Sequence, residues 1–172
     1  MKKADLLRIL SLPLALALAG SGCAGYRLGS MLPKEIHSVH VPMFRNNTAE
    51  PFIETVLTNA VRDEIQKDGS LALENEAEAD TELSITINSY SLQPLSYDRE
   101  NRTLANEYRV LLETSVVLKN RRTGAVVVSY PRVRGDATFD FAGDLTNAKR
   151  QALPAVADDL AHQIVERVVE AW

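Results

Sequence analysis

The alternation of apolar and polar side chains predicts a short strand followed by a helix early in the chain. Between residues 37 and 44 the side chains alternate between apolar and polar, which is typical of a half-buried strand. Pro42 has no N–H to donate, so it marks an edge strand or the end of the strand. Apolar residues then recur at helical spacing over about residues 50–68, and Gly69 is a typical helix end.

Alternating patterns also predict strands in the middle of the chain. Residues 70–80 form a short strand or an extended link and a turn, and residues 81–92 form a strand. The apolar positions of this strand change parity near residues 88–89, which indicates a β-bulge. A polar loop over residues 93–106 leads to the next strand, at residues 107–119.

A tight hairpin connects this strand to the last one. The turn NRRTG, residues 120–124, contains Gly124, which adopts a positive φ easily. The apolar pattern resumes over residues 125–141 on both sides of Pro131, so we expect one long bent strand there.

The C-terminal segment, residues 145–172, returns to helical spacing. Pro154 lies inside it and either kinks one helix or begins a second. Because each strand has one apolar face and each helix one apolar stripe, two helices can cover one side of the sheet. The predicted fold class is α+β, a two-layer sandwich in the order β-α-β-β-β-α. Its sheet is mostly antiparallel, with about four strands and two helices on one face.

The N-terminal segment has the pattern of an export signal. Basic residues precede the apolar stretch Ile9–Gly20, which is too short to span a bilayer as a permanent helix. The small residues Ser21 and Gly22 come directly before Cys23, the only cysteine of the chain. This pattern is similar to a bacterial lipoprotein signal, in which the cysteine is acylated and becomes the new N-terminus. The alternative is an ordinary signal peptide, with no such role for Cys23.

We therefore predict a signal peptide over residues 1–22 and a single domain over residues 23–172, which is long enough for a real core. Each buried methylene of an acyl chain contributes about 0.8 kcal/mol, so two or three chains on Cys23 would anchor this domain firmly. Ala24 follows the cysteine, and an Asp in its place would resemble an inner-membrane retention signal. We expect the periplasmic side of the outer membrane.

The predicted mature chain is acidic overall. Residues 1–22 contain three of the 19 Lys and Arg and one of the 23 Asp and Glu, which leaves 16 against 22, a net charge of −6. This charge argues against general nucleic-acid binding. Acidic groups dominate residues 50–82, whereas residues 97–134 carry eight basic and four acidic side chains. The basic segment is either a surface for an anionic partner or ordinary solvated charge.

The sequence shows no constellation of catalytic or metal-binding residues. The three histidines, His37, His40 and His162, have no Cys or carboxylate partner at metal-ligand spacing, and nucleophile and phosphate-loop motifs are absent. Neighbouring carboxylates such as Asp158 and Asp159 point in different directions on a helix, as solvated surface residues do. We therefore predict a protein that is not an enzyme, with no catalytic residue, metal site or cofactor.

Several segments resemble the LptE family of lipopolysaccharide-assembly lipoproteins. They are CAGYRLG, LPKEIHSVHVPMFRNNTAEPFIETVLTNAVRDEI, EADTELSITINSYSLQPLSYD, ANEYRVLLETSVVLKNRRTG and the strand that contains RGDATF. The resemblance covers nearly the whole chain after the signal. The VPMFRNNTAEP segment alone is also similar to the first strand and helix of TolB-amino-terminal and curli-secretion-type lipoproteins.

The resemblance implies a subunit that plugs an outer-membrane β-barrel of the LptD type and binds lipopolysaccharide. A barrel of many strands encloses a polar lumen that a small domain can occupy. The family also implies that basic residues at strand and loop ends hold the lipopolysaccharide, and guanidinium groups suit phosphate. The arginines in such places are Arg99, Arg102, Arg121, Arg122, Arg132 and Arg134. The alternative is a periplasmic lipoprotein that scaffolds or activates another envelope complex, a cell-wall synthase or a secretion pore, through protein contacts alone.

Overall fold

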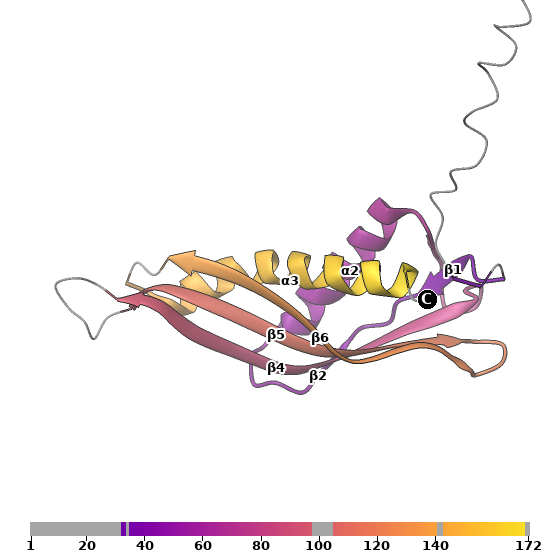
Figure 1. Cartoon of the computed structure of the whole chain (residues 1–172), viewed down its shortest axis with the longest axis horizontal. Coiled ribbons are helices and arrows are strands. Elements are labelled where there is room, and N and C mark those ends of the chain that lie inside the picture. The colour runs from indigo at the N-terminus through magenta and orange to yellow at the C-terminus, as the bar shows by residue number, and fades with distance from the viewer. Residues whose placement is uncertain (1–31, 34, 98–104, 141–142, 171–172) are drawn as a thin grey trace, which may run out of the picture.

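The computed structural model describes residues 32–33, 35–97, 105–140 and 143–170 (Figure 1). Its elements are, in order, β1 (Ser38–His40), β2 (Arg45–Asn46), α2 (Ile53–Asp68), β3 (Ala72–Leu73), β4 (Thr81–Tyr97), β5 (Ala105–Asn120), β6 (Val126–Asp140) and α3 (Leu145–Val169). Both helices lie on one face of a six-stranded sheet. The predicted α+β class and the placement of two helices on one face are confirmed.

The sheet is mixed, with the strand order β3-β1-β4-β5-β6 and β2 paired to β4. The three long strands β4, β5 and β6 are antiparallel, whereas β1 and β2 run parallel to β4, and β3 runs parallel to β1. The expected sheet of about four mostly antiparallel strands is therefore wrong in detail. The reason is the crossover helix α2, since a strand, a helix and a second strand in the same sheet give parallel neighbours.

The strand predicted at residues 37–44 divides into β1 and β2, with Pro42 between them. Pro42 thus marks the end of a strand, and β1 lies inside the sheet between β3 and β4. Beyond Pro42 the alternation fails, because Phe44 is buried and Met43 is 57% exposed. The backbone N–H of Phe44 donates to the hydroxyl of Thr58 in α2 at 3.2 Å, which fixes this bend against the helix.

Helix α2 ends as predicted and begins three residues later than expected. Gly69 has φ 72° and its N–H donates to the Ile65 carbonyl at 3.0 Å. At the other end, Phe52 stands before the helix with φ 67°, a left-handed conformation that costs an ordinary residue about 1–2 kcal/mol. This conformation bends the chain after Pro51, so the helix cannot start at residue 50.

The long strands confirm the predicted bulge and shorten the predicted loop. The β4–β5 register shifts between Ile87 and Ser89, and the side of β4 that packs on the core passes from Ile87 to Tyr90. Strand β4 continues to Tyr97 and β5 begins at Ala105, so half of residues 93–106 is strand. The residues of β4 in this stretch are mostly exposed, Leu95 and Tyr97 included, so no buried apolar face indicates a strand there.

The bounds of β6 and α3 test the expectations for the two prolines in the C-terminal half. Strand β6 runs through Pro131 as one strand with a register shift at this point, as predicted. Helix α3 runs from Leu145 to Val169 with Pro154 inside it, so the alternative of a second helix is wrong. Pro154 has no N–H to donate to the carbonyl of Arg150, four residues earlier in the helix. Both residues are exposed, so this carbonyl faces water.

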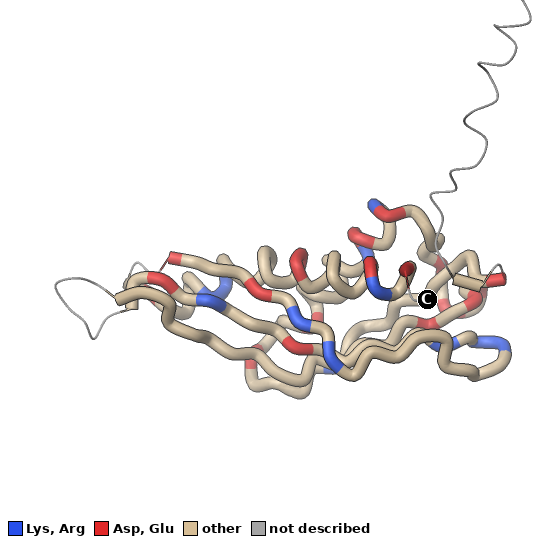
Figure 2. The backbone as a smooth tube through the Cα atoms, viewed as in Figure 1, with Lys and Arg blue, Asp and Glu red and all other residues tan. Residues whose placement is uncertain are grey.

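The core lies between the helices and the inner face of the sheet. Its fully buried side chains include Ile87 and Leu112 of the sheet, Leu57 of α2, and Leu160 and Ile164 of α3. Acidic and basic residues are interspersed along the three long strands (Figure 2). The positions of these strands that alternate with the buried ones carry mostly polar and charged residues and form the opposite face. The fold therefore leaves one broad polar sheet face without a covering layer.

Candidate functional site

The hairpin between β5 and β6 places two of the predicted arginines at one end of the sheet. Oδ1 of Asn120 accepts hydrogen bonds from the N–H groups of Arg122 and Thr123, both at 3.0 Å. Gly124 has φ 72° and donates its N–H to the Asn120 carbonyl at 2.8 Å, as its predicted turn role requires. The NRRTG sequence thus builds a turn that presents Arg121 and Arg122.

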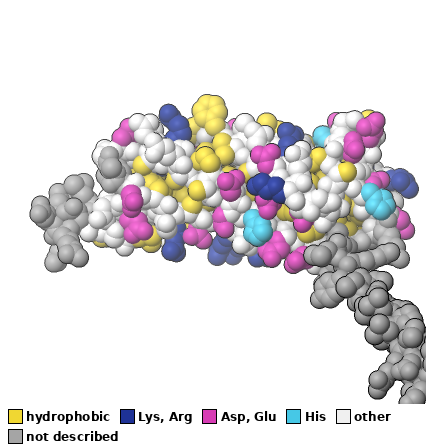
Figure 3. Space-filling model, turned by 90° about the horizontal axis from the view of Figure 1, so that it is seen from above, with side chains coloured by type: hydrophobic (Ala, Val, Ile, Leu, Met, Phe, Trp, Pro, Cys, Tyr) yellow, Lys and Arg dark blue, Asp and Glu magenta, His cyan; other side chains and the backbone are white. Residues whose placement is uncertain are grey.

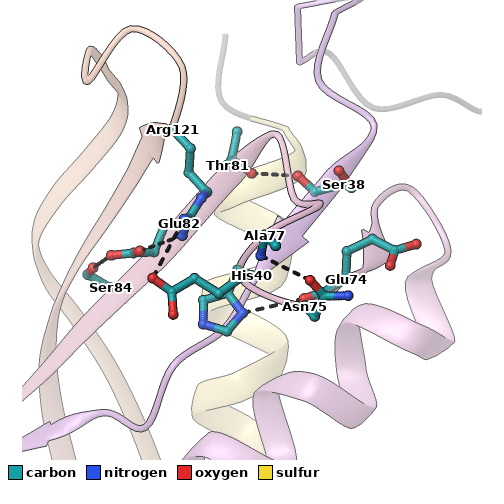
Figure 4. A network of polar contacts seen from close by, with 10 residues as sticks. Ser38, His40, Glu74, Asn75, Ala77, Thr81, Glu82, Ser84 and Arg121 are labelled. Carbon is teal, nitrogen blue, oxygen red and sulfur yellow. Dashed lines mark hydrogen bonds and ion pairs between the residues drawn. The ribbon is translucent and has the colours of Figure 1, made fainter.

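Arg121 connects the hairpin to the segment before β4. Its guanidinium lies 3.0 Å from the Glu82 carboxylate and 3.6 Å from that of Glu76 (Figure 4). Its backbone N–H donates to the Asp80 carbonyl at 2.9 Å. Because the Arg121 side chain is 27% exposed and bound to two carboxylates, it holds structure and has little capacity left for a ligand.

Ser38 and Asp80 fix the strand ends beside this hairpin. The Asp80 carboxylate accepts hydrogen bonds from the His37 N–H at 3.1 Å and the Ser38 hydroxyl at 3.0 Å. These bonds, that from His37 most of all, lower the pKa of Asp80. The Thr81 hydroxyl donates to the Ser38 carbonyl at 2.8 Å (Figure 4). β1 and β4 are therefore joined by side chains as well as by their ladder.

A hollow of about 430 Å³ lies between the hairpin and the segment before β4. Its charged residues are Glu35, Glu78, Asp80, Arg121 and Arg122. Carboxylates outnumber guanidinium groups here, so the interior of the hollow does not suit a polyanion. No carboxylate in the described part of the chain pairs with Arg122, which is exposed. Arg122 is thus the hairpin arginine that a phosphate can reach.

Arg132 and Arg134 flank one carboxylate on the polar face of the sheet. Glu113 lies opposite Arg134 in the β5–β6 register and sits 2.9 Å from it and 3.1 Å from Arg132. The hydrogen bond from Arg134 is the main cause that lowers the pKa of Glu113. The arginine side chains remain 61% and 63% exposed. This cluster therefore has one positive charge in excess that an anion can approach.

The structure does not bring the predicted arginines together in one place. Glu113 is six residues from Lys119 at the base of the hairpin, a separation of about 20 Å along a strand. Arg99 and Arg102 lie outside the described residues. The binding role of all six arginines stays a prediction, and the four described ones form two groups, one at the hairpin and one in mid-sheet.

Sequence reasoning missed a polar network in the loop between β2 and α2. Oδ1 of Asn46 accepts hydrogen bonds from the N–H and the hydroxyl of Thr48 at 2.8 Å, and its Nδ2 donates to the Glu50 carbonyl and the Glu54 carboxylate at 2.9 Å. The network fixes the loop that leads to Phe52. The spacing of Asn46 and Thr48 is a typical turn signal and could have indicated it.

Beside this loop an apolar groove of about 450 Å³ lies between the N-terminal ends of α2 and α3. Tyr90 of β4 lines the groove, and burial, together with the Glu50 carboxylate, raises the pKa of Tyr90 to about 12. The Lys149 Nζ lies 5.2 Å from the centre of the Tyr90 ring and 2.7 Å from the Glu50 carboxylate. No sequence pattern pointed to this groove, because its walls come from three separate elements.

The described residues contain no group of three or more His, Cys, Asp or Glu side chains placed to hold a metal ion. No helix among them combines the length and the apolar character needed to cross a membrane. Cys23 and the predicted signal peptide lie outside the described residues.

The fold is similar to that of several solved bacterial proteins. One is a putative lipoprotein from Caulobacter crescentus, with 17% identity and a TM-score of 0.51 over 74% of this chain and 88% of that one. PelC, a dodecamer from Paraburkholderia phytofirmans, has 14% identity and a TM-score of 0.51 over 83% and 94%. A Xanthomonas campestris protein has 12% identity and a TM-score of 0.57 over 81% and 87%. At these identities the likenesses show the fold alone.

The fold defines a class, the small α+β domains in which two helices cover one face of a mixed sheet. Residues 36–169, from just before β1 to the end of α3, match the family model of LptE, described as lipopolysaccharide-assembly. The chain belongs to the LptE family. No curated protein matches the chain.

Proposed function

We propose that this protein is a non-enzymatic component of the lipopolysaccharide export machinery that sits inside an LptD-type outer-membrane barrel and binds lipopolysaccharide. The observation that carries the proposal is the family match, which spans the whole sheet and both helices. The open polar sheet face supports it, because a domain seated in a polar lumen needs polar outer surfaces. The lipid anchor on Cys23, in the outer membrane, belongs to the same proposal.

Lipopolysaccharide phosphates would meet the exposed arginines on two surfaces. Arg132 and Arg134 supply exposed guanidinium groups around one carboxylate, and Arg122 supplies another that no described carboxylate neutralises. Arginine binds phosphate oxygens with paired N–H groups, so such side chains suit the ligand. In this proposal Arg121 does not bind phosphate. It pairs with Glu76 and Glu82 and so fixes the hairpin that carries Arg122.

The test is an affinity purification of the tagged protein from mildly solubilised membranes, with mass spectrometry and a glycolipid assay. We expect a large β-barrel protein near one-to-one stoichiometry, together with lipopolysaccharide. Recovery of a cell-wall synthase or a secretion pore without a barrel would instead favour a periplasmic scaffold.

The Cys23→Ser variant serves as a matched control for the anchor. It should leave the membrane fraction, and the mass of the mature wild-type protein should include acyl chains. A wild-type protein of unmodified mass would remove the lipid anchor from the proposal without affecting the barrel partnership.

A further inference from the structure

Phe52, which lines the groove between α2 and α3, has an unusual backbone conformation and an exposed side chain. It has a φ of 67°, the one positive φ of a residue other than glycine in the described part of the chain, and 72% of its surface is exposed. Strained conformations of this kind persist where the surroundings impose them and gather at binding sites. Here the surroundings include the Asn46 network, which fixes the loop before Phe52. The loop therefore presents an aromatic ring to solvent.

The apolar part of the groove is made of flat and rigid surfaces. Pro51, Phe52, Tyr90 and Pro154 line it, together with the aliphatic Leu153. Its volume of about 450 Å³ lies within the range of about 300–1,000 Å³ that is typical of ligand sites. The helix-covered face seen in Figure 3 shows hydrophobic side chains at the surface among charged ones. Flat walls of this kind favour another flat ring as the occupant.

The charges around the groove favour an anion. Glu50 and Lys149 pair at 2.7 Å and compensate each other. Arg150 also lines the groove, and no residue within the described ranges pairs with its guanidinium. One carboxylate and two cations thus leave a positive charge beside the apolar wall, and a guanidinium group suits a carboxylate in particular.

We propose that this groove binds a segment of a partner protein that carries an aromatic side chain next to a carboxylate. The ring packs against Phe52 and Leu153, and the carboxylate meets Arg150. The groove lies on the helix-covered face, whereas Arg132 and Arg134 lie on the opposite face of the sheet. The inference is therefore independent of lipopolysaccharide binding, and either can fail alone.

The first experiment titrates two small probes into the ¹⁵N-labelled purified full-length protein and follows amide chemical shifts. N-acetyl-tryptophan has an indole beside a carboxylate, and N-acetyl-tryptophanamide is the same molecule without the charge. We expect the acid to shift the amides of Phe52, Val56 and Leu153 and to bind about threefold more tightly than the amide. Equal affinities, or shifts that map elsewhere, would overturn the proposal.

Three variants separate the contributions. Arg150→Gln should abolish the preference for the acid, and Phe52→Gly should weaken both probes while the protein stays folded. Lys119→Gln removes an exposed cation of β5 and should change neither affinity. A preference for the acid that survives in Arg150→Gln would contradict the assigned role of this residue.

A lipid probe tests the other class of occupant. Dihexanoylphosphatidylglycerol, kept below its micellar concentration, offers acyl chains and a phosphate. If it shifts the same amides and binds more tightly than N-acetyl-tryptophan, the groove is a lipid site and the proposal of a protein partner is wrong. Weaker binding of the lipid supports the peptide segment.

Discussion

Gly135 of β6 lies directly against Leu160 of α3. A Cβ atom on Gly135 would come within 2.6 Å of the Leu160 Cβ and 2.8 Å of the Leu160 Cα and N. The adjacent Asp136 donates its N–H to the Asp159 carboxylate at 2.9 Å, so the strand and the helix are joined at the same level. A side chain at position 135 would have to push the helix backbone away from the sheet.

Gly135→Ala should therefore destabilise the fold. Backbone atoms of Leu160 cannot turn aside as a flexible side chain can, so we expect a loss of about 1–3 kcal/mol in the free energy of unfolding. Thermal unfolding should show a fall in Tm of about 3–9 °C. Ser129→Ala, at an exposed position of the same strand, is the matched control and should change little. An unchanged Tm for Gly135→Ala would mean that the helix shifts at no cost.

The contact between α2 and α3 contains a pair that responds to pH. Nδ1 of His162 lies 3.0 Å from the Glu64 carboxylate, and this hydrogen bond is the main cause that raises the pKa of His162 and lowers that of Glu64. Because the pKa of His162 is raised, the pair stabilises the fold below about pH 6.5, the ordinary histidine pKa. This contribution is lost as the pH rises through the folded pKa of His162. Because the pKa of Glu64 is lowered, its carboxylate stabilises the fold above about pH 4.5, and this contribution is lost as the pH falls through its folded pKa.

The stability that His162 contributes should consequently be largest between about pH 4.5 and 6.5. We expect the Tm difference between wild type and His162→Gln to peak there and to shrink as the pH rises through the folded pKa of His162. His40→Gln, which removes a histidine outside this pair, is the control variant. A Tm difference that stays constant across this range would contradict the pairing.

The hairpin arginines should differ in what their reversal does. Arg122→Glu should leave the Tm unchanged, because no described residue depends on its guanidinium, and should weaken lipopolysaccharide binding about two- to fivefold at low salt. Arg121→Glu should lower the Tm, since a third carboxylate would then face Glu76 and Glu82. Thermal unfolding and a binding isotherm with purified lipopolysaccharide distinguish the two. An unchanged affinity in a folded Arg122→Glu protein would remove Arg122 from the site.

The mid-sheet cluster allows a separate test of the same ligand. The Arg132→Glu and Arg134→Glu double variant surrounds Glu113 with like charges, so lipopolysaccharide binding should fall about tenfold or more at low salt. The Lys119→Glu variant reverses one exposed cation of β5 and makes half of the net-charge change of the double variant, −2 against −4. A loss of binding free energy in Lys119→Glu that is half that of the double variant would show that only net charge matters.

The long elements of this fold follow from the sequence, and its short ones do not. Alternation over more than ten residues fixed the faces of β4, β5 and β6, and the parity change at Ile87 located the bulge. Strands of two or three residues, such as β2 and β3, are too short for any period to appear. Their parallel pairing depends on the crossover of α2, which only the tertiary structure defines.

The site residues show the same division. Gly124 and Gly69 adopt the positive φ that their turn and helix-end positions predict. The partners of the arginines could not be predicted, because Glu82 and Glu113 lie 39 and 21 residues from Arg121 and Arg134. The groove at Phe52 depends on three elements that meet only after folding.

We expect the Asn46 side chain to contribute to the free energy of unfolding although it lies in a surface loop. Its side chain makes four hydrogen bonds that fix the entry to α2. Asn46→Ala removes all of them, and we expect a loss of about 1–3 kcal/mol, measured by chemical denaturation. Asn47→Ala is the neighbouring control, because the Asn47 backbone N–H bonds to the Ile87 carbonyl and survives the change. Equal stabilities of the two variants would show that water replaces the Asn46 bonds.

Phe52→Gly should raise the stability of the protein while it weakens binding in the groove. Glycine adopts a φ of 67° without strain, which outweighs its greater freedom in the unfolded chain, so the gain should be about 0.5–1 kcal/mol. The Tm should rise by about 2–3 °C. Gly69→Ala is the matched reverse change at φ 72° and should lower the Tm by a similar amount. A lower Tm for Phe52→Gly would mean that packing of the ring within this chain outweighs the strain, and the exposed aromatic would then need no partner to explain it.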